Sequence, residues 1–208
     1  MPGTQDGCRP LVVGIGADMF GYTLKEELRD ALEADPCVGE LRDFGVFSDE
    51  DPRPYPAVGL EVAESVRAGE LDRAILICGT GIGMAISANK VPGVRATVAY
   101  DQYSVERSVL SNDCQVLTLG GKVVMPELAR RIVKDWLRYR FDSSSPSAAK
   151  LDLIRRYEHI VAQYASPGLQ PINSPATVAS PSQEANAGTP SNDRAPAGGR
   201  TSTRIGGN

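Results

Sequence analysis

The sequence predicts an α/β fold in which a five-stranded parallel sheet is covered by helices on both faces. Short, β-prone apolar runs alternate five times with helical stretches between residues 10 and 139. This alternation requires crossover helices, and these place parallel strands side by side beneath two helical layers. The length of 208 residues and the hydrophobic content of 41% suit one domain of ordinary core size with an appendage.

The elements can be placed in chain order from their patterns. The first helix is predicted from the apolar stripe of Leu24, Leu28, Ala31 and Leu32, and Pro126 suits the first turn of the fifth. The predicted strands span 10–16, 41–46, 74–77, 94–99 and 114–119, and the predicted helices span 22–34, 57–68, 82–89, 103–110 and 126–139.

Three further segments lie outside this alternation. A last helix at 148–165 has no strand of its own, and we expect it to pack on a partner subunit. Residues 166–208 are rich in Ser, Pro, Gly, Ala, Asn and Thr and contain no aromatic residue, so we expect them to be disordered. Residues 1–9 are expected to be a flexible N-terminus, which leaves 10–165 as the folded domain.

Charge and composition exclude several classes of function. A net charge of −4 offers no general attraction for nucleic acid or an anionic membrane. No apolar run approaches the ~20 residues of a membrane span, and the N-terminus has no signal-peptide pattern. We therefore expect a cytoplasmic protein with neither a nucleic-acid nor a membrane partner.

The cysteines and the single histidine argue against a metal site. The four cysteines have long, irregular spacings with no CxxC pair, which disfavours both zinc and a disulfide framework. His159, in the predicted last helix, cannot by itself make a histidine metal site or a Ser-His-Asp triad.

Cys78 stands at the carboxyl end of the third strand, directly before a glycine-rich turn. Gly79, Gly81 and Gly83 let the backbone approach a ligand and point N–H groups at an anion. A thiol in this position is a candidate nucleophile or general base, although free cysteines are also commonly buried for packing. The turn lacks both the GxGxxG spacing and a P-loop lysine, so its chemistry stays open at this point.

Several stretches together resemble one family. They are "GADxxGxxLKE", "YP", "ILICGTGIGMAISANKVPGVRA" and "DxYSxxRxxxSNDxxVLxLGGxVV", and they are similar over residues 10 to about 160 to the ribose-5-phosphate isomerase B and galactose-6-phosphate isomerase family. The resemblance implies a Rossmann-like three-layer α/β/α sandwich and a homodimer or tetramer with active sites between subunits. It also implies interconversion of phosphorylated aldoses and ketoses through a cis-enediol, with no metal and no cofactor.

The resemblance assigns roles to individual residues. Cys78 would be the base, the amides of the 79–83 turn would hold the enediolate oxygen, and Thr80 would assist proton movement on the sugar oxygens. Asp18 would hold sugar hydroxyls, unless it only caps a helix, and Tyr55 would line the pocket, unless it only packs. The full set of expected substrate-binding residues is Asp18, Tyr55, Gly79, Gly81, Ile82, Gly83, Ser111, Asn112, Lys122 and Lys150.

Departures from the family pattern bear on the substrate. Met19 replaces a phosphate-binding histidine, Ser111 replaces the histidine credited with ring opening, and Pro146 replaces an arginine. Phosphate binding then falls to Lys122 and Lys150, whose ammonium groups grip differently from a guanidinium fork. We expect a ribose 5-phosphate type of isomerase, with D-erythrulose 4-phosphate as the alternative because this four-carbon sugar needs no ring opening.

Two other functions remain open. A non-catalytic sugar-phosphate-binding protein would keep the fold and the pocket without the acid-base chemistry. A nicotinamide-dependent oxidoreductase is disfavoured, because Met19 stands where the third glycine of the dinucleotide fingerprint belongs.

Overall fold

The computed structural model describes residues 9–164 of the chain. The predicted flexible start at 1–9, apart from Arg9, and the predicted disordered tail at 166–208 lie outside the described residues. No helix between residues 9 and 164 is long and apolar enough to cross a membrane. Within the same range, no three His, Cys, Asp or Glu side chains are grouped closely enough to hold a metal ion.

The five predicted strands form one sheet in which every pairing is parallel, as expected. The spatial order is β2-β1-β3-β5-β4, so the central β3 lies between the first and last strands of the chain. The strands are β1 (Leu11–Ala17), β2 (Val38–Asp43), β3 (Arg73–Cys78), β4 (Ala96–Val98) and β5 (Val116–Gly120).

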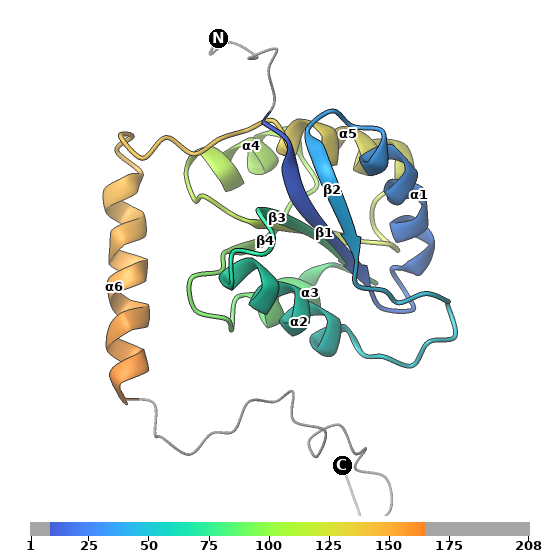
Figure 1. The fold of residues 1–208 in the computed structure, drawn as a ribbon, viewed down its shortest axis with the longest axis horizontal. Coiled ribbons are helices and arrows are strands. Elements are labelled where there is room, and N and C mark those ends of the chain that lie inside the picture. The colour runs from blue at the N-terminus through green and yellow to red at the C-terminus, as the bar shows by residue number, and fades with distance from the viewer. Residues whose placement is uncertain (1–8, 165–208) are drawn as a thin grey trace, which may run out of the picture. The chain divides into compact units, whose positions relative to one another are not determined.

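Helices cover both faces of this sheet, which confirms the predicted three-layer sandwich (Figure 1). One face carries α1 (Tyr22–Glu33), α4 (Gln102–Leu110) and α5 (Pro126–Trp136), and the other carries α2 (Tyr55–Arg67) and α3 (Ile82–Ala88). The sixth helix, α6, spans Ala148–Tyr164.

The strand β3 connects the two cores. All six of its residues are buried, as expected for a strand covered on both faces. Ile75 and Ile77 face the core beneath α1 and α5, whereas Leu76 and Cys78 face the core beneath α2 and α3. The alternation therefore directs the last side chain of the strand towards the α2 and α3 side.

One strand is displaced from its predicted position. The sequence places the second strand at 41–46, but β2 runs from Val38 to Asp43. This strand lies at the edge of the sheet and pairs with β1, so residues such as Glu40 remain in solvent. The apolar residues that favoured a later strand follow it in the chain. Among the described cysteines, Cys37 is disulfide-bonded, whereas Cys78 and Cys114 are free thiols.

The helix α6 contributes little to either core. Leu151 is its one buried side chain. The Glu158 Oε2 accepts the Gly93 N–H at 3.1 Å, and Arg155 approaches Asp113 at 3.9 Å. Large apolar side chains along the helix are exposed, namely Leu153, Ile154, Tyr157, Ile160, Val161 and Tyr164. Packing of this helix on a partner subunit stays a prediction.

Candidate active site

Asp18, Cys78 and the glycine turn at 79–83 lie at the carboxyl edge of the sheet, where β1 and β3 end. The chain leaves β1 towards β2 on one side and later returns to β3 on the other, so a crevice is expected between these strands. Asp18 follows β1 and Cys78 ends β3, and the Asp18 N–H donates to the Ile77 carbonyl at 3.1 Å. The backbone thus fixes the two loops side by side.

The Cys78 thiol lies under the glycine turn. The side chain is buried, and its Sγ accepts the Gly81 N–H at 3.1 Å. Gly81 has a φ of 76°, and a Cβ added there would lie 3.0 Å from the Leu119 carbonyl carbon. Glycine is therefore required here both for the left-handed backbone and for the close approach to β5.

A second glycine turn, after β5, is bonded to the first. The Gly121 N–H donates to the Cys78 carbonyl at 2.8 Å, and the Lys122 N–H donates to the Gly79 carbonyl at 3.1 Å. A Cβ at Gly120 would lie only 2.8 Å from the Thr80 Cα. Lys122 is thereby held beside the loop that carries the thiol.

The Lys122 ammonium is further held by an aromatic ring that the sequence analysis did not single out. Its Nζ lies 4.1 Å from the centroid of the Phe20 ring, within the range of a cation–π contact. The Phe20 side chain stays half-exposed at the rim. A lone phenylalanine in a loop gives no sequence signal for this contact, because its partner is more than a hundred residues away.

Asp18 has a role within its own loop. Its Oδ1 accepts the N–H of Phe20 at 2.9 Å and that of Gly21 at 3.1 Å, while Gly21 is the residue that caps α1. Burial raises the pKa of the Asp18 carboxyl above its usual value, although these two amides and the nearby Lys122 charge oppose the rise. The carboxyl thus orders the turn that follows β1.

Three more residues complete this edge. The Tyr55 ring lies against Gly83, where an added Cβ would be 2.6 Å from the ring. Thr80 is exposed on top of the turn, and its Oγ1 accepts the Ile82 N–H at 3.4 Å. The Tyr100 hydroxyl, which the sequence analysis did not select, donates to the Thr80 carbonyl.

The remaining expected residues lie at the opposite edge of the sheet. Asn112 follows α4 and precedes β5, and both its carbonyl and that of Asp113 accept the Arg95 side chain. Cys78, in contrast, pairs with Gly120 at the far end of β5, roughly 15 Å away for a strand of this length. Ser111 precedes Asn112 directly and belongs to the same distant edge, so this chain alone does not bring the two residues to the thiol. Lys150 is exposed near the start of α6.

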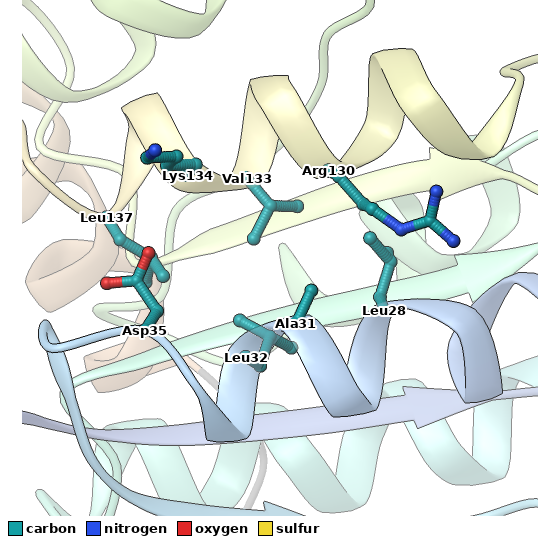
Figure 2. Close-up of a pocket in the computed structure, with 8 residues that line it drawn as sticks. All are labelled: Leu28, Ala31, Leu32, Asp35, Arg130, Val133, Lys134 and Leu137. Atoms are coloured by element: carbon teal, nitrogen blue, oxygen red, sulfur yellow. The ribbon is translucent and has the colours of Figure 1, made fainter.

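A hollow elsewhere on the molecule does not belong to this site. Figure 2 shows apolar side chains of α1 and α5 facing one another, with charged groups at the ends. They line a cavity of about 100 Å³. Its lining contains neither a thiol nor a glycine turn. The lining residues are Leu28, Ala31, Leu32, Asp35, Arg130, Val133, Lys134 and Leu137.

Comparison with known proteins gives a consistent assignment. The Ribose/Galactose Isomerase family model matches residues 13–154. D-erythrulose-4-phosphate isomerase 2 of Mycolicibacterium smegmatis is 54% identical over 71% of this chain and 97% of that protein. Ribose-5-P isomerase B of Listeria innocua is 43% identical over 70% of this chain and 96% of that protein. The solved ribose-5-phosphate isomerase B of Clostridium thermocellum superposes with a TM-score of 0.68 at 43% identity, covering 72% of this chain and 99% of that chain.

Proposed function

The chain belongs to the Ribose/Galactose Isomerase family, and we propose that it interconverts an aldose phosphate and a ketose phosphate through a cis-enediol. The observation that carries the proposal is the placement of the Cys78 Sγ under the Gly81 amide, beside the loop of Lys122. A base, a set of amides and a cation then lie along one edge of the sheet.

The chemistry moves one proton between two carbons. The Cys78 thiolate takes the proton from C2 of the aldose, and the electron pair of that C–H bond forms the C1–C2 double bond of the enediolate. The C1 carbonyl oxygen receives the negative charge and takes up a proton, and amides of the 79–83 turn stabilise it meanwhile. The thiol then returns its proton to C1 while the O2 proton leaves, which gives the ketose with no net change in atoms or electrons. Thr80, exposed above the turn, is suited to relay protons between the two oxygens.

A four-carbon sugar phosphate is the substrate that we propose first. Two features support it: Ser111 in place of a histidine that could open a sugar ring, and 54% identity to an enzyme named for D-erythrulose 4-phosphate. Ribose 5-phosphate is the second candidate, favoured by the 43% identity to proteins named for it.

We also propose that a second copy of this chain completes the site. Asn112 lies at the edge of the sheet opposite Cys78, so its expected substrate contact requires a neighbouring chain. The exposed apolar side chains of α6 support this, since Leu153, Tyr157 and Ile160 recur at helical spacing on one side.

Turnover of the purified protein with each sugar phosphate tests the proposal. We expect D-erythrulose 4-phosphate to be converted with a higher kcat/KM than ribulose 5-phosphate, and deuterium from heavy water to enter the product at C1 or C2. Cys78→Ala should abolish conversion but keep ligand binding. Cys114→Ala, which removes the free thiol at the other end of the sheet, should keep conversion intact.

Failure would take two distinct forms. Preference for ribulose 5-phosphate would replace the four-carbon assignment with the second candidate. Binding of both sugars without conversion of either would indicate a sugar-phosphate-binding protein and overturn the isomerase proposal.

A further inference from the structure

Tyr100 occupies a position at the site that the proposed mechanism leaves without a task. It follows β4 closely, its ring is half-buried, and its hydroxyl donates to the Thr80 carbonyl. The contact joins the loop after β4 to the glycine turn after β3. Neither strand pairs with the other, because β5 lies between them.

The acceptor of this hydrogen bond is one end of a peptide group whose other end contacts the thiol. The Thr80 carbonyl and the Gly81 N–H belong to the same planar amide, and this N–H donates to the Cys78 Sγ at 3.1 Å. Tyr100, the amide and the thiol therefore form one continuous hydrogen-bonded chain from O–H to sulfur.

Hydrogen bonds in such a chain polarise one another. A donor on the carbonyl draws electron density towards the oxygen and makes the N–H of the same amide a better donor. The better donor favours the thiolate over the thiol, since a hydrogen bond to a charged acceptor is the stronger of the two. The bond from Tyr100 also fixes the plane of the amide, and with it the direction of the N–H.

We propose that Tyr100 is a positioning residue that sets the reactivity of the Cys78 thiol through the Thr80–Gly81 peptide group. Its effect on turnover rests on the proposed function, but its effect on the thiol does not. Tyr100 remains a hydrogen-bond donor at neutral pH, because burial of the ring and then the negative charge of Cys78 raise the pKa of its hydroxyl.

Other charged or titratable groups lie on the elements next to the glycine turn. Asp18 lies on the loop after β1, Lys122 on the loop after β5, and Tyr55 at the start of α2. None of them contacts the Thr80–Gly81 amide through a hydrogen bond that the structure records between residues 9 and 164. The effect of Tyr100 can therefore be separated from theirs by removing its hydroxyl alone.

Tyr100→Phe provides this removal, and Tyr103→Phe is the matched control. Tyr103 lies three residues further on, in α4, and is 73% exposed, and its hydroxyl makes no hydrogen bond that the structure records between residues 9 and 164. The measurement is the rate of iodoacetamide alkylation at Cys78 against pH, quantified by mass spectrometry on the peptide that contains Cys78. Thermal unfolding of each variant checks that the fold is retained.

We expect Tyr100→Phe to move the midpoint of alkylation upward by about 0.5 pH unit, which is about a threefold slower reaction below the midpoint, whereas Tyr103→Phe leaves it unchanged. The acid limb of kcat/KM should move by the same amount, with KM affected less than kcat. A Tyr100→Phe midpoint equal to that of the unaltered protein would overturn the inference, as would an equal shift in both variants.

The alkylation needs no turnover, so its outcome separates this inference from the proposed function. A shifted midpoint in a protein that converts no sugar phosphate supports the role of Tyr100 while rejecting the isomerase. An unshifted midpoint in an active isomerase does the reverse.

Discussion

Replacement of Gly81 by alanine tests whether the glycine turn is built around a close backbone approach. Gly81 has a φ of 76°, and an added Cβ would meet the Leu119 backbone at 3.0 to 3.2 Å. Gly69 has nearly the same φ, 75°, but nothing lies within 4 Å of its added Cβ. An alanine at either position therefore has the unfavourable left-handed backbone, but only the alanine at Gly81 also meets a close neighbour.

The left-handed backbone alone should cost either alanine variant roughly 1–2 kcal/mol of folding stability. At Gly81 the β5 backbone must also move, which adds about 1–3 kcal/mol, as in overpacked cores. We therefore expect Gly81→Ala to lose roughly 2–5 kcal/mol and Gly69→Ala roughly 1–2 kcal/mol.

Urea unfolding followed by the fluorescence of Trp136, the single tryptophan and fully buried, measures both variants. Gly81→Ala should also slow turnover, because its amide shifts away from the Cys78 Sγ, while Gly69→Ala should keep full activity. Equal losses of stability in the two variants would refute the close approach to Leu119.

Three further outcomes are expected. Asp18→Asn should raise the melting temperature at pH 7. The pKa of the Asp18 carboxyl is raised in the folded protein, so the stability of the unaltered protein falls as pH rises above the usual pKa of 3.8, and the advantage of the variant should vanish near that pH. A difference in melting temperature that stays the same at every pH would contradict this. Lys122→Met should raise the KM for a sugar phosphate by about 10- to 100-fold, because one hydrogen bond to a charged group is lost. The control variant Lys134→Met, at an exposed position, should leave the KM unchanged. Equal KM values for the two variants would exclude Lys122 from phosphate binding. Leu153→Glu combined with Tyr157→Glu should convert an oligomer to monomers in size-exclusion chromatography and abolish turnover, whereas an active monomer would reject the shared site.

The fold was predictable because local patterns and global topology agree. The run from Ala74 to Ile77 is apolar and β-prone throughout, as a strand covered on both faces must be, and the position of Cys78 at its end followed directly. The edge strand β2 was less predictable. Its polar residues, such as Glu40, face solvent and carry no periodic signal.

The candidate site was predictable only where function leaves a mark in a contiguous stretch. The thiol and its glycines lie together in the sequence. Tyr100 and Phe20 were missed because each contacts a partner on another loop, and an isolated aromatic residue has no spacing that would point to that partner. Both contacts become visible only when the fold places the loops side by side.

The two backbone hydrogen bonds between the glycine turns have a consequence for substrate length. The Cys78 and Gly79 carbonyls accept hydrogen bonds from the amides of Gly121 and Lys122, so the two loops are fixed to each other. In the proposed function, the first loop carries the base and the second carries a cation for the phosphate. The fixed separation between the base and the cation then limits how many carbons can lie between the reacting bond and the phosphate. A sugar phosphate of the wrong length would place its acidic carbon out of reach of the sulfur.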